Sequence, residues 1–252
     1  MIIDTHCHLD LFLKNPSAFS SVLSDFTKLN LTPQFISMTT DSGQWVDHLT
    51  FSKAYPQVHC SLGIHPWYAH NVKFNDLNDL RSLLDTQPVT ALGEIGLDFS
   101  HEFKPHQDAQ LEVFYPQLEL AQCFSKPVSI HVVKAHSEMF RALSEYNSYG
   151  VIHGLGASLQ VAQRYVDLGF KIGVNGVSVR SNARRYHALV KHFGLDHLVL
   201  ETDFPYVKLP GLVESQLVNV LTVADQLASL LNVSLDTVLQ ITSQNAHDVF
   251  KF

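Results

Sequence analysis

Cysteine is scarce in this sequence, and basic residues are outnumbered. The 252 residues include three cysteines, Cys7, Cys60 and Cys123, and their spacing matches no disulfide framework. Such sparse cysteines are typical of reduced thiols, so we expect a cytoplasmic protein. Lysine and arginine number 17 against 24 acidic residues, for a formal net charge of −7. This balance argues against a strong non-specific nucleic-acid binder but does not exclude an enzyme that handles phosphates through metal ions.

Long hydrophobic runs are also missing. No apolar stretch reaches the roughly 20 residues that a transmembrane helix needs, and no signal segment opens the chain. We therefore expect a soluble protein with no membrane partner and no obligatory protein partner. Apolar residues still make up 46% of the chain, enough for a sizeable core. No linker or low-complexity tract divides the chain, so we expect a single domain over residues 1–252.

Eight short apolar runs, each typical of a β-strand, recur along the chain. Helical patterns separate them, which predicts parallel pairing. Eight such units in about 250 residues predict a (β/α)8 TIM barrel of the α/β class. The rival, an open Rossmann-type sheet, would need a glycine-rich turn after the first strand, where this chain has THCHLD. The strand candidates are residues 1–6, 34–40, 58–65, 89–98, 127–133, 149–156, 170–176 and 197–203.

Two features concern the predicted helices. Residues 213–231 and 234–250 follow the eighth strand and predict extra C-terminal helices. Pro116 lies inside the helical pattern of residues 107–124, where we expect it to kink or interrupt the helix.

Ionisable side chains stand at the ends of most of the predicted strands. His6 and His8 end the first strand two residues apart, so their imidazoles face the same way, while Cys7 points away into packing. Catalytic residues of such barrels lie at the carboxyl ends of the strands. A lone histidine there is most often structural, but a set at one end of several strands predicts a functional site, because buried ionisable groups need partners or a metal. The other strand ends supply His65, Glu94, His131, His153 and Asp203.

These donor types indicate a metal centre. Imidazole and carboxylate together suit hard and borderline divalent cations. Four histidines and two carboxylates are too many for one four-coordinate site with an open position. They fit two ions that share a bridging carboxylate, about 3.5–4 Å apart. We therefore expect two divalent ions, with Zn, Mn and Mg all open.

Six motifs together resemble a known family. DTHCHLD, GIHPW, GEIGLD, PVSIH, VIHGLGAS and ETDFP occur in the order and spacing of the TatD family of metal-dependent deoxyribonucleases, within the amidohydrolase-like barrel superfamily. The resemblance covers nearly the whole chain, from Met1 to Phe250. The HxH opening alone is shared with many metal hydrolases, whereas its combination with GEIGLD and ETD-x-P is specific.

The resemblance implies a ligand set for two metals. His6 and His8 would hold the first ion, and His131 and His153 would hold the second. Glu94 would bridge the two.

The resemblance also implies a reaction and its catalytic residues. Asp203 would bind the first metal and steer the attacking water, and His65 would lie near the substrate phosphate. Strand-end reasoning alone does not separate His65 from the ligands. We expect a divalent-metal-dependent phosphodiesterase, a deoxyribonuclease of exonuclease type that acts on DNA or a small phosphodiester. Two alternatives stay open: an amidohydrolase or esterase acting on a small amide, lactone or phosphoester, and a weakly active metal-binding scaffold.

The surroundings of the site depart from the family pattern. After the fifth-strand histidine the family places a small polar residue and an arginine, whereas this chain has Val132 and Val133, then Lys134. Valine side chains do not hydrogen-bond a phosphate, and Lys134 offers a point charge rather than a bidentate fork. We therefore expect weak substrate binding with a modest salt dependence.

Overall fold

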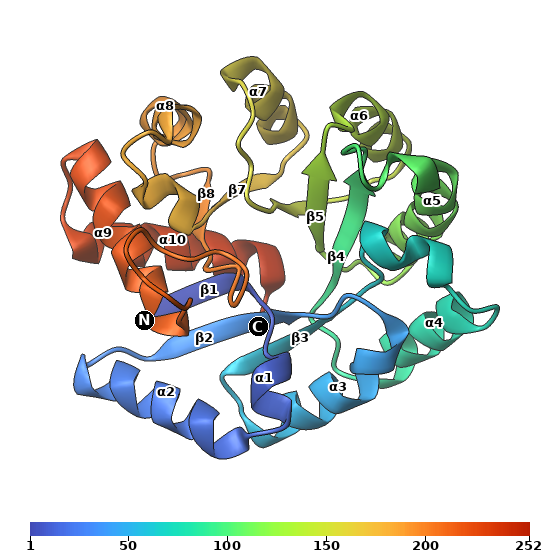
Figure 1. Cartoon of the computed structure of the whole chain (residues 1–252), viewed down its shortest axis with the longest axis horizontal. Coiled ribbons are helices and arrows are strands. Elements are labelled where there is room, and N and C mark those ends of the chain that lie inside the picture. Colours follow the sequence, from blue (N-terminus) through green and yellow to red (C-terminus); the bar gives the residue numbers. More distant parts are fainter.

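Eight parallel strands form the centre of the computed structural model, which describes residues 1–252. Each strand pairs with the next one in chain order from β1 to β8, so the sheet curls into a nearly closed TIM barrel (Figure 1). The predicted barrel is therefore confirmed. The strands are β1 (Ile2–Cys7), β2 (Pro33–Met38), β3 (Val58–Leu62), β4 (Ala91–Asp98), β5 (Val128–Val133), β6 (Gly150–Ile152), β7 (Lys171–Val174) and β8 (Leu198–Leu200).

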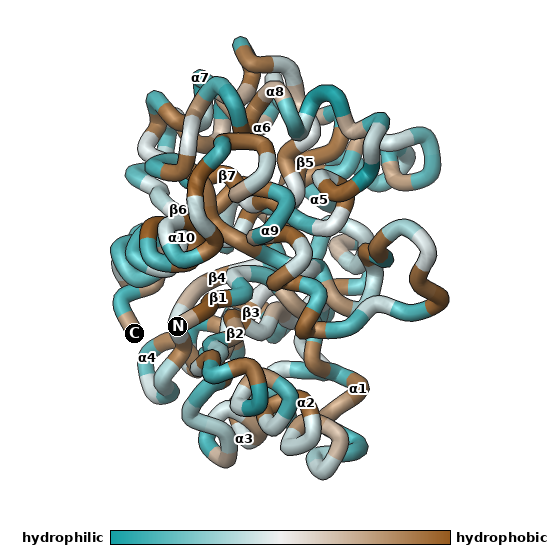
Figure 2. The backbone as a smooth tube through the Cα atoms, turned by 90° about the vertical axis from the view of Figure 1, so that its left-hand side faces the viewer, coloured by the Kyte–Doolittle hydropathy of each residue, from teal (hydrophilic) through white to brown (hydrophobic).

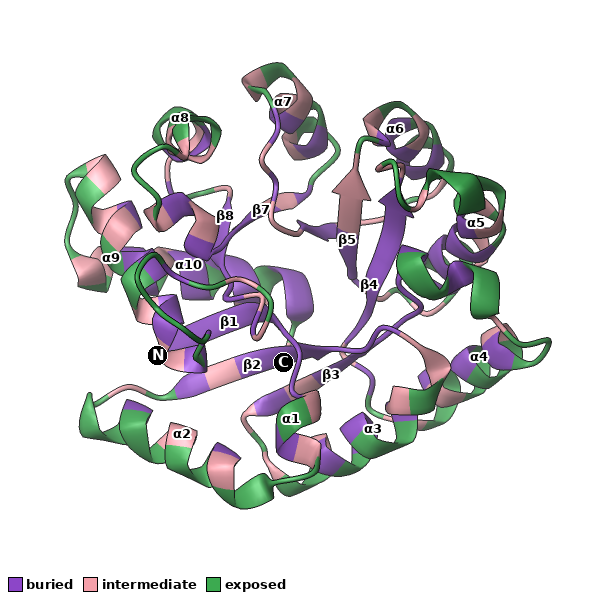
Figure 3. Cartoon of the chain, viewed as in Figure 1, coloured by how far each residue is buried: buried purple, intermediate pink, exposed green.

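Helices alternate with the strands and surround the barrel. Their inner faces are buried and their outer faces exposed (Figure 3), and hydrophilic and apolar residues alternate along them accordingly (Figure 2). The α-helices are α1 (Asp10–Leu13), α2 (Pro16–Lys28), α3 (Trp45–Ala54), α4 (Asp76–Thr86), α5 (Gln107–Cys123), α6 (His136–Glu145), α7 (Leu159–Asp167), α8 (Arg184–Phe193), α9 (Val220–Leu231) and α10 (Leu235–Phe250). Short 3-10 helices are η1 (Ser42–Gln44), η2 (Pro66–Asn71), η3 (Lys104–His106), η4 (Gly176–Val179) and η5 (Leu217–Asn219). None of the helices is by itself both long and apolar enough to cross a membrane.

Two hydrophobic clusters hold this architecture together. The larger contains 54 buried residues and lies mainly between the strands and the surrounding helices. A second cluster joins residues of β1, β2, β4, β6 and β8 to α10. Because these strands are spread around the barrel, their side chains meet in its interior, and this cluster therefore fills the inside of the barrel. Asn245 of α10 donates to the carbonyls of Leu195 and Leu198 at the start of β8, so α10 closes the amino-terminal end of the barrel. The second cluster comprises Ile3, Ile36, Met38, Ala91, Val151, Val199, Ala246, Val249 and Phe250.

The seam between β1 and β8 closes the barrel without a continuous ladder. A single bridge pairs Cys7 with Phe204, and the His8 N–H donates to the Phe204 carbonyl at 2.7 Å. The buried carboxylate of Asp4 completes the seam, because it accepts from the Thr202 N–H at 3.0 Å and from the Thr202 hydroxyl at 2.6 Å. Burial raises the pKa of Asp4 to about 7, although the hydrogen bonds from Thr202 oppose the rise. The first and last strands are thus joined by backbone hydrogen bonds at their carboxyl ends and by the side chains of Asp4 and Thr5.

Two local predictions differ from the structure. Pro116 does not interrupt α5, which runs through it from Gln107 to Cys123. The helix tolerates the lost hydrogen bond because its buried face is anchored, and Gln117 accepts from the Ile64 N–H at 2.8 Å and donates to the Ile64 carbonyl at 3.2 Å. The helix expected to begin at residue 213 begins with η5 instead, since Val213 is 85% exposed and has no surface to pack against.

We predict that Asp4→Ala destabilises the fold through the seam. The change leaves the buried N–H and hydroxyl of Thr202 without an acceptor, which costs about 1–3 kcal/mol per unsatisfied group. Urea unfolding of the metal-free protein measures the loss in the free energy of unfolding. Asp85→Ala, on an exposed turn of α4, is the control and should stay within about 0.5 kcal/mol of wild type. Equal losses in the two variants would contradict the role of Asp4.

Candidate metal centre

Five imidazoles surround the carboxylate of Glu94 at the carboxyl end of the barrel. Glu94 lies on β4 and is 4% exposed. Its Oε2 faces the β1 pair, 3.4 Å from His6 Nε2 and 3.5 Å from His8 Nε2. Its Oε1 faces the other side of the barrel. The distances from that oxygen are 3.3 Å to His65 Nε2, 2.8 Å to His131 Nδ1 and 3.9 Å to His153 Nε2.

Asp203 lies across the pocket from Glu94, in the segment after β8. Its Oδ1 is 4.0 Å from His6 Nε2 and 3.7 Å from His8 Nε2, and its Oδ2 is 3.7 Å from His153 Nε2. The structure therefore brings together all seven residues singled out in the sequence. Three trios have donor atoms within 4.8 Å of one another: His6, His8 and Asp203; His6, Glu94 and His153; and His65, Glu94 and His131.

The orientation of His6 fits a metal ligand. Its Nε2 is buried and has no hydrogen-bond partner, an arrangement that costs free energy unless another group is bound there. Its Nδ1 lies 3.0 Å from the hydroxyl of the buried Ser129. The hydroxyl can accept from Nδ1, which leaves the Nε2 lone pair for a cation. The donor set and this unpaired nitrogen together fit divalent metal ions.

Burial and neighbouring charges shift the pKa values of these groups in opposite directions. Burial, with His153 nearby, lowers the pKa of His6 to about 4. Burial also acts to lower the pKa of His153, but Glu201 and Asp203 outweigh it and raise that pKa to about 10. Burial raises the pKa of Asp203 to about 6 against the pull of His153 and His8. Buried groups with such divergent ionisation cluster at functional sites.

His65 differs from the other imidazoles in its hydrogen bonding. Its Nδ1 accepts from the Trp67 N–H at 3.2 Å, and burial lowers its pKa to about 4, so the ring is neutral with its proton on Nε2. His65 therefore presents an N–H donor to the pocket. Its Nε2 is close enough to Glu94 and His131 to share a cation, but that would require the opposite tautomer. The hydrogen bond from the Trp67 N–H therefore distinguishes His65 from the imidazoles that offer a nitrogen lone pair to a metal.

Asp98, which sequence reasoning missed, positions His131. The carboxylate at the end of β4 accepts from Trp67 Nε1 at 2.8 Å and lies 3.3 Å from His131 Nε2. Burial would raise the pKa of Asp98, but hydrogen bonds from His131, Trp67 and Ser100 outweigh it and hold the pKa below its usual value. The signal was present in the sequence, since Asp98 is the last residue of the GEIGLD motif.

Glu201 was missed as well, and it positions His153. The carboxylate is fully buried, accepts from the Gly154 N–H at 2.8 Å and lies 3.0 Å from His153 Nδ1. A Cβ on Gly173 of β7 would lie 2.0 Å from Glu201 Oε2, so only glycine leaves room for this carboxylate. Glu201 stands two residues before Asp203 in ETD, and that spacing could have suggested a shared facing.

A small cavity of about 120 Å³ opens above these groups. Its walls include three aromatic residues and no lysine or arginine. The lining residues are His8, Thr40, His65, Trp67, Tyr68, Glu94, His131, His153, Asp203 and Tyr206. Lys134, expected from the sequence to be the nearest cation, is exposed beyond the end of β5 and does not line this cavity.

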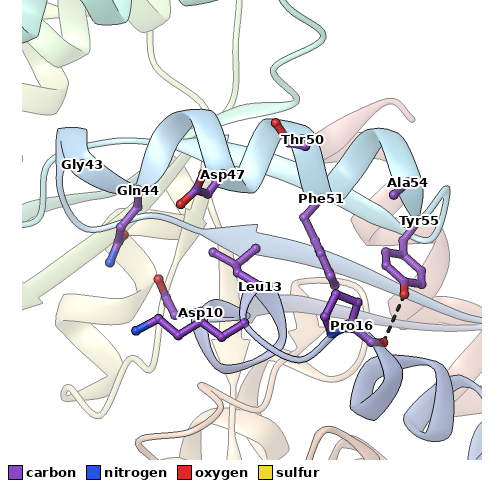
Figure 4. Close-up of a pocket in the computed structure, with 11 residues that line it drawn as sticks. Asp10, Leu13, Pro16, Gly43, Gln44, Asp47, Thr50, Phe51, Ala54 and Tyr55 are labelled. Carbon is purple, nitrogen blue, oxygen red and sulfur yellow. Dashed lines mark hydrogen bonds between the residues drawn. The ribbon is translucent and has the colours of Figure 1, made fainter.

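A larger cavity, about 730 Å³, lies beside the candidate metal pocket, between α1 and α3. Asp10, Gln44 and Asp47 stand at one end and Phe51 and Tyr55 at the other (Figure 4). Its lining contains no histidine or cysteine, so it offers carboxylates but no mixed ligand set. The metal centre is therefore the smaller cavity.

Comparison with known proteins agrees with this geometry. The family model described as TatD related DNase matches residues 3–251. The chain belongs to the TatD family. A metal-dependent hydrolase of Escherichia coli K12, YjjV, described as uncharacterized, is 32% identical over 218 residues, which cover 83% of this chain and 81% of the relative. TatD membership makes this chain a metal-dependent hydrolase, as expected from the sequence.

One further relative and one solved structure extend the comparison within the TatD family. A putative deoxyribonuclease of Danio rerio, tatdn3, is 28% identical, with 98% of this chain and 96% of the relative covered. The crystal structure of the E. coli TatD homologue YjjV superposes with a TM-score of 0.91 at 28% identity, covering 100% of this chain and 98% of that one.

We predict that Glu201→Gln weakens metal binding at His153. The amide keeps the shape of the side chain but removes the charge that orients and polarises the imidazole, and loss of such a partner typically costs about 10–100-fold in metal affinity. Competition with a chromophoric chelator measures the affinity. Glu214→Gln, an exposed residue of the loop after β8, is the matched control. Equal affinities in the two variants would rule out this role for Glu201.

Proposed function

We propose that the chain is a deoxyribonuclease that hydrolyses phosphodiester bonds with the help of two divalent ions. The observation that carries the proposal is the placement of Glu94. One of its oxygens faces His6 and His8, and the other faces His131 and His153. A carboxylate with one oxygen directed at each of two imidazole pairs is what a bridge between two metals requires.

The ligands divide between two ions in this proposal. His6 and His8, with Asp203, would hold one ion, His131 and His153 would hold the other, and Glu94 would contact both. Zn, Mn and Mg are the candidate metals, because the donors mix imidazole with carboxylate. When bound, the ions lower the pKa of a water and offset negative charge on the phosphoryl group.

Two side chains of the protein act on the reaction itself. Asp203, whose carboxylate faces both His8 and His153, orients the attacking water and accepts its proton. As the water oxygen bonds to phosphorus, the bond from phosphorus to the in-line leaving oxygen breaks, and that oxygen takes a proton from solvent. His65 donates its Nε2 proton as a hydrogen bond to a phosphoryl oxygen and stabilises the charge that builds there.

The choice of DNA as substrate is supported by the family description and by the name of the zebrafish relative. The site would also suit a small ester or amide, because the same attacking water serves those bonds. Protein reconstituted with Mg²⁺, Mn²⁺ or Zn²⁺ is therefore tested against single-stranded DNA, RNA, small phosphodiesters, lactones and amides. We expect turnover of DNA that stops on chelation. Rapid turnover of a lactone or amide without DNA cleavage would establish the esterase or amidohydrolase alternative, and no turnover of any substrate would favour the scaffold.

We predict that Glu94→Gln and Asp203→Asn have different effects. Glu94→Gln should abolish activity and loosen both metals, because one carboxylate contacts both ions. Asp203→Asn should lower kcat by about 10²–10⁴-fold, the usual contribution of a general base, and reduce metal content less because other ligands remain. Elemental analysis beside a rate assay tests both. A Glu94→Gln protein with two tightly bound metals and near-normal turnover would overturn the bridging role.

A further inference from the structure

Three aromatic rings stand at the rim of the metal pocket. Trp67 is 41% exposed, Tyr68 40% and Tyr206 64%. The ionisable side chains at the floor of the same cavity are at most 14% exposed. Large aromatic side chains are expensive to leave in water, and several around one cavity mark a surface that contacts a ligand. The rim of the cavity therefore presents aromatic ring faces, whereas its floor presents ionisable groups.

The rings are held in place by the floor of the pocket. Trp67 stacks on Phe103 with ring centroids 4.8 Å apart and an interplanar angle of 14°, and its indole N–H is fixed by Asp98. Tyr206 stands nearly perpendicular to His8, at 5.0 Å and 77°. The orientation of both rings is thus tied to the groups around the metals. Trp67 therefore has little rotational freedom left to lose when a flat ligand binds.

We propose that Tyr206 and Trp67, with Tyr68 beside them, stack a nucleobase next to the phosphodiester that is cleaved. This inference rests on the proposed deoxyribonuclease function. Every base has a π-face, so stacking holds a strand without selecting its sequence.

Stacking would also contribute binding free energy for the substrate in a pocket where no protein cation contributes it. No lysine or arginine lines it, so protein cations do not grip the phosphate that is cleaved. The neighbouring large cavity is unsuitable for the rest of the strand, because Asp10 and Asp47 face it with Lys14 as its one basic lining residue (Figure 4). Phosphates there would meet a net negative charge.

Cations lie on the opposite side of the mouth. They lie in the segment between β7 and the first turn of α8 and in the loop after β8, at the same end of the barrel as the pocket, and none of them forms an ion pair within 4.0 Å. They are outside the cavity, so they would contact phosphates further along the strand and carry the salt-dependent part of binding. The four exposed cations are Arg180, Arg184, Arg185 and Lys208.

The first test removes the Tyr206 ring. With a short single-stranded deoxyoligonucleotide, Tyr206→Leu should raise KM by about 5- to 140-fold, the equivalent of 1–3 kcal/mol of stacking, and change kcat less. The increase should be similar at low and high salt. Tyr206→Phe should restore the KM of wild type. Tyr149→Leu, at the opposite end of the barrel before β6, is the matched control and should leave KM unchanged.

A base-free substrate makes this test specific. An oligomer of propanediol phosphodiesters presents the phosphates without bases, so its KM should be the same for wild type and Tyr206→Leu. An equal loss on both substrates would overturn the inference while leaving the phosphodiesterase function intact. Absence of DNA cleavage by the wild type would instead defeat the proposed function.

A binding measurement tests the stacking without turnover. Trp67 and Trp45 are the two tryptophans of the chain, and Trp45 is 2% exposed, so a stacked base quenches Trp67 alone. Titration of the metal-loaded protein with a deoxynucleoside monophosphate should quench the fluorescence, and deoxyribose 5-phosphate should not. Trp67→Phe should abolish the quenching. Equal quenching by both ligands, or quenching that persists in Trp67→Phe, would contradict stacking on this ring.

Discussion

The buried carboxylate of Glu94 is the constraint on which the rest of the site depends. Removing a charge from water costs several kcal/mol unless partners surround it, and five imidazoles supply those partners within 4 Å. Burial alone would raise the pKa of Glu94, but His65 and His6, with a hydrogen bond from His131, hold it well below its usual value. Every strand that contributes a donor must therefore end at the same height around this one carboxylate.

An outer ring of polar groups holds the imidazoles in position. Ser129 contacts His6, Asp98 contacts His131, and Glu201 contacts His153. In each pair the contact is made by the ring nitrogen that points away from Glu94. Such contacts fix the tautomer and the tilt of a ligand. Gly173 makes room for one of these contacts, because the Glu201 carboxylate occupies the space that a side chain at position 173 would take.

The barrel and the positions of the seven central residues followed from the sequence, because parallel strands bring their carboxyl ends together and strand alternation aligns His6 with His8. The outer ring did not follow. Asp98 and Glu201 lie in the same motifs as Glu94 and Asp203, but a sequence does not say which carboxylate faces the cation and which faces the back of an imidazole. The tautomer of His65 depends on a backbone N–H two residues away, and the aromatic rim depends on loop conformation. The continuity of α5 through Pro116 depends on the hydrogen bonds between Gln117 and Ile64, and helix propensity along the sequence does not reveal such long-range contacts.

The seam between β1 and β8 has a consequence for when activity arises. His6 lies in the first strand that leaves the ribosome and His8 directly follows it. Asp203 follows the last strand, and Asp4 and Thr202 close the gap between the two strands. A nascent chain without β8 has neither the closed barrel nor the carboxylate opposite Glu94. Synthesis thus delays assembly of a hydrolytic centre until nearly the whole polypeptide exists. A chain that ends before β8 therefore lacks the complete set of donors around Glu94.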